Sequence, residues 1–252
     1  MIVITFALPQ ESRELRRALQ PLHPFGPPSL DLQIGSASGL PIVLAQTGVG
    51  PIATTHAIST LLAFQKPQLL ISTGFAGGLN PKLASGDLLL ATNFTTPTLL
   101  ENTRTLLRHE PQLHFGSLLS QSLPAESLAE KSALATTTGA SAVDMETASI
   151  YRACLDADVP MISLRAISDS AQVPLPVPFA KWFDLQTQRP KPLALLQFLT
   201  LHPSKISPFF HFIRGLSPAR QSFTRAVLRL LPAPTPHIRS AKSSPSSPSS
   251  PD

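Results

Sequence analysis

Short apolar runs alternate with segments of helical spacing through the first 170 residues, and this alternation limits the folds open to the chain. Strands are predicted at residues 1–7, 32–36, 41–47, 68–73, 87–94, 116–120, 140–144 and 161–167. Helices are predicted at residues 11–19, 51–64, 125–136 and 146–157. Because helices of this length between strands make crossover connections, the pattern predicts an α/β fold. We expect a single three-layer αβα domain around a central, mixed but largely parallel twisted sheet.

The last third of the chain has a different composition. Residues 1–180 carry 10 Lys or Arg against 13 Asp or Glu, whereas residues 181–252 carry 10 against 2, and 14 of the 27 prolines lie from Pro174 onward. Leucine-rich segments between these prolines predict helices at 193–200, 208–216 and 218–231, and a Ser/Pro repeat follows. We therefore predict three parts: a domain at 1–172, a basic helical extension at 173–231 and a disordered Ser/Pro tail at 232–252.

The cysteine and histidine content limits which cellular compartments and which cofactors are compatible with the chain. A single cysteine, Cys154, excludes a disulfide framework and a multi-cysteine metal site. The seven histidines show no ligand-type pairing, so no metal site is expected. No apolar run reaches the roughly 20 residues of a membrane span, and the apolar first seven residues lack the basic start of a signal peptide. We expect a cytoplasmic protein.

Candidate site residues follow the predicted strands, where ligands bind in sheets of this kind. Glu11 opens a helix after the first strand, although an acid there also fits a simple interaction with the helix dipole. Gly48 and Gly50 form a turn between a strand and a helix, and its amides could face an anion or a hydroxyl. A tight turn would explain these two glycines equally well.

Two further segments carry more information. Residues 72–79 contain three glycines, which are predicted to form a loop whose backbone approaches a ligand closely. Glu146 and Asp169 each follow one of two consecutive predicted strands. Two carboxylates delivered to the same sheet edge are difficult to explain by packing, because burying a charge is costly without a partner or a function.

The ordered combination of these segments resembles the nucleoside phosphorylase and nucleosidase superfamily over about residues 1–172. The branch that it resembles most is the methylthioadenosine/S-adenosylhomocysteine nucleosidases. The motifs that carry the resemblance are Ala7…Glu11, Thr47-Gly48-Val49-Gly50, Thr73-Gly74-x-Ala76-Gly77-Gly78-Leu79, Gly86-Asp87, Asp144-Met145-Glu146 and Arg165-Ala166-Ile167-Ser168-Asp169.

The resemblance implies an enzyme that cleaves the N-ribosidic bond of a purine nucleoside and releases adenine without a cofactor. Asp169 would be the acid at the purine N7, and Glu11 would orient or deprotonate the attacking water. Glu146, with Met145 beside it, would hold the ribose hydroxyls. The remaining substrate contacts that the resemblance implies are Ser168, Gly48, Gly50, Thr73, Gly74, Phe75, Ala76, Gly77 and Leu123. It also implies a homodimer.

The basic residues of the candidate site bear on whether water or phosphate is the nucleophile. Phosphorolytic members of the superfamily bind phosphate through arginines, because a dianion needs charge-assisted donors. Neither residues 72–79 nor residues 7–10 contain a basic side chain, so hydrolysis by water is favoured. Phosphorolysis, with phosphate as the co-substrate, stays the alternative. Phe75 departs from the nucleosidase pattern, which has a small residue there, and its ring would reshape the anion or water subsite.

The extension raises the question of the substrate. Phe223, Val227 and Leu230 lie on one side of a predicted basic amphipathic helix, which either packs on the core or contacts an anionic membrane surface. The layout of the extension is similar to that of the hopanoid-associated phosphorylase branch, which implies an adenosylated lipid such as adenosylhopane as the substrate. Membrane contact would then involve residues 191–231, at the inner face of the membrane.

Other functions stay open at this stage. The soluble thioether nucleosides methylthioadenosine and S-adenosylhomocysteine are alternative substrates, and a nucleoside sensor is the alternative without catalysis. Nucleic-acid binding through the basic stretch is not expected, because Phe209, Phe212 and Phe223 have a helical spacing suited to burial and no DNA or RNA motif is present.

Overall fold

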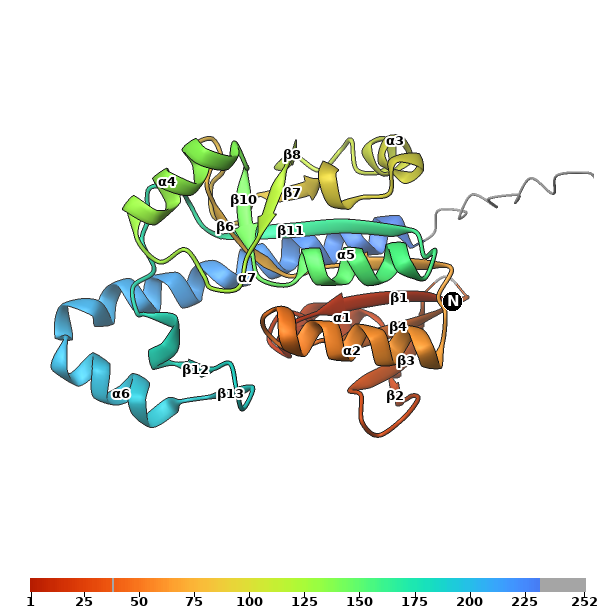
Figure 1. The fold of residues 1–252 in the computed structure, drawn as a ribbon, viewed down its shortest axis with the longest axis horizontal. Coiled ribbons are helices and arrows are strands. Elements are labelled where there is room, and N and C mark those ends of the chain that lie inside the picture. The colour runs from red at the N-terminus through yellow and green to blue at the C-terminus, as the bar shows by residue number, and fades with distance from the viewer. Residues whose placement is uncertain (38, 232–252) are drawn as a thin grey trace, which may run out of the picture.

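The computed structural model describes residues 1–37 and 39–231. Its main sheet follows the order β2-β3-β4-β1-β5-β11-β6-β10-β9, with β7 paired to β11 and β8 paired to β7 (Figure 1). The strands of this sheet are β1 (Ile2–Phe6), β2 (His23–Pro24), β3 (Leu32–Ala37), β4 (Leu40–Gln46), β5 (Leu69–Ser72), β6 (Phe75–Gly78), β7 (Leu88–Ala91), β8 (Leu113–Gly116), β9 (Leu118–Ser120), β10 (Ala142–Asp144) and β11 (Met161–Asp169). A small antiparallel pair, β12 (Phe183–Asp184) and β13 (Arg189–Pro190), lies outside it.

Helices cover both faces of the sheet. The α-helices are α1 (Arg13–Ala18), α2 (Pro51–Phe64), α3 (Pro97–Leu106), α4 (Leu128–Thr138), α5 (Thr147–Asp156), α6 (Pro192–Leu201) and α7 (Ile206–Leu230). Short 3₁₀ turns are η1 (Thr92–Phe94), η2 (Phe179–Lys181) and η3 (Pro203–Lys205). The helix predicted at 51–64 coincides with α2. Helix α3 was not predicted, and the strand predicted at 87–94 ends at Ala91, where η1 begins.

Alternating residues of the central strands enter two separate cores. On one face, Val3 and Val43 pack with Ile58 of α2 and Ile150 of α5. On the other face, the even-numbered residues of β1 pack with residues of α1 and α7. Strand β1 pairs in parallel with β4 and β5, whereas β3 is antiparallel to β4 and β7 is antiparallel to β11. The predicted three-layer αβα architecture with a mixed, largely parallel sheet is thereby confirmed.

Strand β11 joins the two parts of the sheet. Its first residues pair with β5, its middle residues with β7 and its last residues with β6. The pairing with β6 shifts between Ile167 and Asp169, so Ser168 is an extra residue in a β-bulge. Bulges redirect the side chains that follow them. The bulge therefore changes the direction in which the end of β11 presents its side chains.

The loop predicted at residues 72–79 is wrong in part, because residues 75–78 form strand β6 between β11 and β10. The glycines serve close packing at this place. A Cβ on Gly77 would lie 3.4 Å from Asp169 Oδ2, and one on Gly78 would lie 3.1 Å from the Asp169 carbonyl oxygen. Small residues permit this approach without ending the strand, so the glycines here indicate close packing and not a loop.

The two helices predicted at 208–216 and 218–231 are a single helix, α7, with Pro218 inside it. Proline in a helix interior removes one hydrogen bond and costs about 3 kcal/mol. Burial of Phe223, Val227 and Leu230 against the sheet offsets that cost and keeps the chain helical beyond Pro218. The boundary predicted at residue 172 stays a prediction, but residues 219–231 belong to the same core as β1 and β11.

Helix α6 and the first part of α7 extend away from the sheet (Figure 1). We call residues 192–216 the helical arm. Across the part of the chain that the structure describes, no helix is both long enough and apolar enough to cross a membrane. The predicted Ser/Pro tail at 232–252 lies outside the described residues.

Candidate active site

The three carboxylates singled out in the sequence lie after strands β1, β10 and β11. Glu11 follows β1, Glu146 follows β10 at the start of α5, and Asp169 ends β11. Glu11 and Asp169 are buried, and Glu146 is half-buried. We call this region the carboxylate edge, defined by these three residues.

Glu11 is held by backbone amides. The Ala7 and Leu8 amides each donate to Glu11 Oε2 at 2.8 Å, and the Phe75 amide donates to Oε1 at 3.0 Å. Gly74 has a φ of +146°, and a Cβ there would lie 3.0 Å from Glu11 Oε1. Burial raises the pKa of Glu11 above its ordinary value, while these hydrogen bonds lower it in part. Glu11 therefore joins the first strand to the start of β6 and is poised to accept a proton.

Glu146 contacts the glycine turn that follows β4. Its Oε1 accepts a hydrogen bond of 2.8 Å from the Gly50 amide, and its Oε2 accepts one of 3.3 Å from the Met145 amide. Gly50 has a φ of +84°, a conformation that favours glycine, and it precedes α2. Burial, with the charges of Asp144 and Glu11 as further causes, raises the pKa of Glu146 to about 8.

A buried ion pair supports the residues that precede Glu146. Arg165 Nε donates to Asp144 Oδ2 at 2.9 Å, and NH2 of Arg165 donates to Ser72 Oγ at 2.8 Å and to Thr147 Oγ1 at 2.6 Å. Asp144 in turn accepts from the Thr147 amide at the start of α5. A buried carboxylate and guanidinium that satisfy each other in this way fix the relative positions of β5, β10 and β11.

Asp169 lies directly after the bulge at Ser168. The Ser168 hydroxyl donates to Asp169 Oδ1 and also contacts the Ala76 carbonyl oxygen at 3.3 Å. Lys131 Nζ of α4 donates to Asp169 Oδ2, and both side chains are buried. The structure thus brings Asp169, Ser168, Ala76 and Gly77 together.

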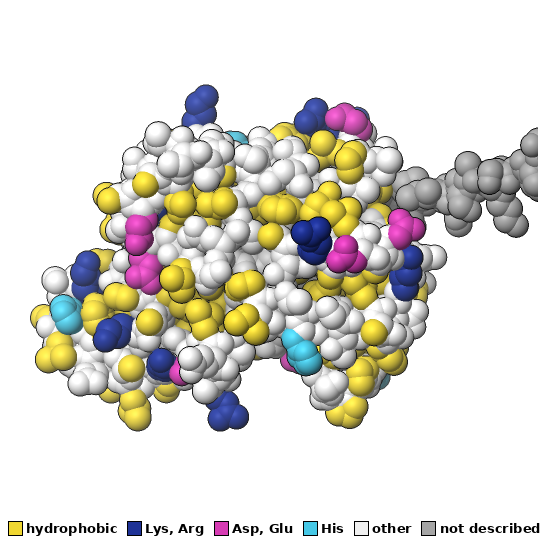
Figure 2. All heavy atoms as spheres, in the orientation of Figure 1, with side chains coloured by type: hydrophobic (Ala, Val, Ile, Leu, Met, Phe, Trp, Pro, Cys, Tyr) yellow, Lys and Arg dark blue, Asp and Glu magenta, His cyan; other side chains and the backbone are white. Residues whose placement is uncertain are grey.

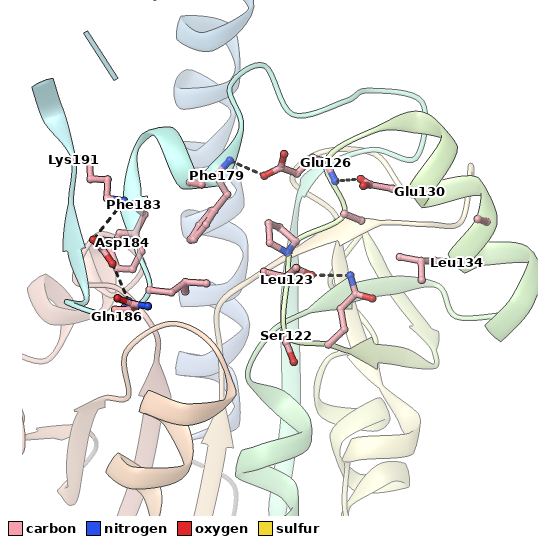
Figure 3. A pocket seen from close by; sticks show the side chains of 16 residues that line it. Ser122, Leu123, Glu126, Glu130, Leu134, Phe179, Phe183, Asp184, Gln186 and Lys191 are labelled. Carbon is pink, nitrogen blue, oxygen red and sulfur yellow. Dashed lines mark hydrogen bonds and ion pairs between the residues drawn. The ribbon is translucent and has the colours of Figure 1, made fainter. Parts of the chain in front are cut away.

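A cavity of about 990 Å³ adjoins the carboxylate edge, although the three carboxylates do not line it (Figure 3). Its walls come from two segments, residues 121–134 and residues 179–191. Leu123, which is 64% exposed, lies on the first wall. On the second wall, Phe183 packs in one cluster with Met145. The cavity is as large as ligand sites of drug-sized molecules, and it begins beside Met145.

The other predicted site residues have mainly structural contacts. Thr73 Oγ1 donates to the Thr5 carbonyl oxygen at 2.8 Å, which ties β5 to β1. The Phe75 ring packs edge-on against Phe223 of α7, with ring centroids 6.3 Å apart. Phe75 therefore meets Glu11 through its backbone amide, whereas its ring contacts the helix.

Two residues of this region were not identified from the sequence. Gln188 accepts from the Val49 amide at 2.7 Å and donates to the Val49 carbonyl oxygen at 3.0 Å, so it clamps the glycine turn. Nothing in its local sequence marks it. Lys131 could have been found, because it lies three residues before Leu134 and four before Ala135, on the apolar side of its helix.

Comparisons with known proteins identify the family of the chain. A family model described as Phosphorylase superfamily matches residues 1–99 and 92–189. The 5'-methylthioadenosine/S-adenosylhomocysteine nucleosidase of Staphylococcus epidermidis is 29% identical over 214 residues, which cover 73% of this chain and 92% of that protein. The protein of the same name from Pseudoalteromonas translucida is 26% identical over 227 residues, covering 77% and 95%.

Solved structures share the fold. The 5'-methylthioadenosine/S-adenosylhomocysteine nucleosidase of Neisseria meningitidis in complex with methylthio-immucillin-A aligns with a TM-score of 0.67 at 20% identity, covering 91% of this chain and 97% of that chain. The futalosine hydrolase of Helicobacter pylori aligns with a TM-score of 0.58 at 23% identity, covering 67% and 87%.

Proposed function

The chain belongs to the phosphorylase superfamily, and from this premise we propose that it hydrolyses the N-ribosidic bond of a purine nucleoside and releases the free base. The observation that carries the proposal is the carboxylate edge, where three carboxylates with different partners lie at the ends of β1, β10 and β11, two of them buried and Glu146 half-buried. Carboxylates placed in different surroundings can take different roles in one reaction. The nucleosidase names of the relatives support the same reaction class.

Each carboxylate has a role in this reaction. Water attacks C1′ of the ribose and passes a proton to Glu11, whose pKa is raised by burial and so suits a base. The N9–C1′ bond breaks, its electron pair moves to the purine, and Asp169 delivers a proton to N7. Glu146 accepts hydrogen bonds from the ribose hydroxyls and, in its ionised form, places negative charge near the developing oxocarbenium ion. No cofactor enters these steps.

The state of the nearby cations supports water as the nucleophile. The NH2 and Nε groups of Arg165 are engaged with Ser72, Thr147 and Asp144. Lys131 is engaged with Asp169 and with two carbonyl oxygens. A phosphate dianion needs charge-assisted donors, and both of these described cations already have acceptors.

We further propose that the nucleoside carries a large apolar group at ribose C5′, as in an adenosylated lipid such as adenosylhopane. The cavity beside Met145 supports this, because most of its lining is apolar. Its apolar side chains are those of Leu123, Pro124, Ala125, Ala133, Leu134, Phe179, Ala180, Phe183 and Leu185. The cavity gives such a group a place next to the ribose subsite, without burying it in the sheet.

The helical arm supports contact with an anionic membrane surface. Leu193 is 81% exposed and Leu201 is 69% exposed, and Phe210 and Ile213 are exposed as well. Residues 185–231 contain no Asp or Glu, and basic side chains lie among these apolar ones, as the lower left of Figure 2 shows. Exposed apolar residues next to basic ones are typical of helices that lie on lipid headgroups.

The first experiment follows free adenine from four substrates: methylthioadenosine, S-adenosylhomocysteine, adenosine and a lipid-linked adenosine in detergent, each with and without phosphate. We expect phosphate-independent release from the lipid-linked substrate, and no release by Asp169→Asn. A strict phosphate requirement would show phosphorolysis. Release from the soluble thioethers alone would identify a methylthioadenosine/S-adenosylhomocysteine nucleosidase, and no release from any substrate would favour a nucleoside sensor.

A second experiment tests the membrane contact by co-sedimentation with vesicles. We expect binding to vesicles that contain anionic phosphatidylglycerol and weak binding to neutral phosphatidylcholine vesicles. Equal binding to both kinds of vesicle would contradict the membrane proposal, and so would binding to neither. Either result would leave the helical arm as a contact for a protein. Size-exclusion chromatography of the same sample tests the predicted homodimer.

A further inference from the structure

Lys131 is a buried lysine whose partners lie at the end of β11. Its side chain is 1% exposed, and Nζ donates to Asp169 Oδ2, to the Ser170 carbonyl oxygen at 2.8 Å and to the Val173 carbonyl oxygen at 2.7 Å. An ammonium has three N–H groups, and each has an acceptor here. These three contacts satisfy every N–H of an ammonium and fix its direction.

The segment just before Lys131 holds the later part of the loop that follows β11. Ser127 and Glu130 form a capping box at the start of α4. Glu126 accepts from the Leu175 amide through its carbonyl oxygen at 2.9 Å, and from the Phe179 amide through Oε1 at 2.6 Å. The start of α4 thus fixes the chain from Asp169 to Phe179. One end of this chain carries the acid, and the other end forms a wall of the cavity.

The described partners of Asp169 are both hydrogen-bond donors. Both of its described partners, Ser168 Oγ and Lys131 Nζ, donate to it, which is the arrangement of an ionised carboxylate. An ionised carboxylate cannot by itself protonate a leaving base. The proton must reach Asp169 from a neighbouring group, and Lys131 already has an N–H in place on Oδ2.

We propose that Lys131 is a positioning residue that acts through Asp169 and supplies the proton that Asp169 gives to the base. The inference rests on the proposed nucleosidase function. As the N9–C1′ bond breaks and its electron pair moves to the purine, Lys131 passes a proton to Asp169, and Asp169 passes a proton to N7. Lys131 is left as a neutral amine, and the proton that Glu11 took from the attacking water returns to it through solvent after the base has gone.

The test compares two leaving groups in Lys131→Met. A purine needs a proton to leave, whereas p-nitrophenolate leaves without one, so p-nitrophenyl β-D-riboside bypasses the acid. We expect kcat on the purine nucleoside to fall at least about 30-fold, a part of the 10²–10⁴ that a positioned acid contributes. Cleavage of the nitrophenyl riboside should stay within about threefold of the wild type, and Asp169→Asn should show the same divergence.

Arg220→Met is the matched control, because Arg220 forms a partly buried ion pair with Glu14 at 3.0 Å on another face of the sheet. It should leave the ratio of the two rates unchanged. If Lys131→Met does not fold, Lys131→Gln replaces it, since an amide can still donate to Asp169 but has no proton to transfer. Parallel loss on both substrates, or no loss on either, would overturn the role of Lys131. A wild type that releases no purine would instead refute the proposed function.

Discussion

The carboxylate edge and the helical arm both reverse the usual distribution of side chains between interior and surface. At the carboxylate edge, Glu11 and Asp169 are buried and Glu146 is half-buried. In the helical arm, Leu193, Leu201 and other large apolar side chains face water. Carboxylates are rarely buried without a partner, and monomeric proteins rarely gather exposed leucines on one projecting element.

The two regions differ in what compensates for this reversal. Inside the molecule, backbone amides, Ser168 and Lys131 satisfy the carboxylates, so the described structure accounts for their burial. In the described structure several apolar side chains of the arm, among them Leu193, Leu196 and Leu201, stay exposed. A buried charge is thus explained by chemistry within the chain, whereas an exposed apolar face points to something outside it.

The largest expected effect separates catalysis from the arm. Asp169→Asn removes the group that protonates the purine, and kcat should fall by about 10²–10⁴. The double variant Leu193→Gln/Phe210→Gln should release adenine from a soluble nucleoside at the wild-type rate. A spectrophotometric adenine assay on both proteins checks this, and a rate loss in the arm variant would remove the distinction between the regions.

The second prediction compares two phenylalanines of α7. Phe223→Ala should lower the free energy of unfolding by about 3–5 kcal/mol, because Phe223 is fully buried between the helix and the sheet. Phe210→Ala, on the exposed part of the same helix, should change it by no more than about 0.5 kcal/mol. Urea denaturation of both variants measures the difference. Similar losses would mean that the arm is packed in solution.

The third prediction concerns pH and the buried Glu146. Its pKa is raised from 4.5 to about 8 in the folded protein. Between these values the folded chain holds a proton on Glu146 that the unfolded chain has released, so the contribution of Glu146 to stability is fully present below pH 4.5 and is lost as pH rises toward 8. The decline is on the order of a few kcal/mol. Unfolding free energies of wild type and Glu146→Gln should diverge with rising pH, and parallel curves would contradict the prediction.

The smallest expected effect is on the arm alone. Lys191, Lys205 and Arg214 lie in or beside it, and each basic side chain near anionic headgroups contributes about 1 kcal/mol. Each single change to Gln should weaken binding to phosphatidylglycerol vesicles about fivefold, while Lys82→Gln, on a loop of the domain, should leave it unchanged. Equal effects at all four positions would indicate a general charge effect instead of a surface on the arm.

Sequence reasoning reached the carboxylate edge because its residues follow strands. Glu11, Glu146 and Asp169 lie at strand ends. Strands β1 and β11 both run parallel to β5, whereas β10 runs antiparallel to β6, so the parallel-strand rule accounts only for Glu11 and Asp169. Their hydrogen-bond partners depend on the fold. Lysines on helices are usually exposed to solvent, so Lys131 of α4 was not predicted to be a site residue.

The arm shows a different limit of sequence reasoning. Helical periodicity identifies an apolar face, but it cannot say what covers that face. The pattern at 218–231 is covered by the sheet, whereas the apolar side chains of α6 are not. Strand β6 shows a similar limit, because Gly77 and Gly78 are needed for close contact with Asp169, which is distant in sequence.

Strand β11 has a consequence for how the molecule opens. Hydrogen bonds connect it to β5, β7 and β6, so the two parts of the sheet cannot separate while its pairing is intact. The amide hydrogens at its centre should therefore exchange with solvent only when the whole domain unfolds, which makes them reporters of global stability. Strand β11 should therefore hold the slowest-exchanging amide hydrogens of the domain, and the proposed acid, Asp169, lies at its end.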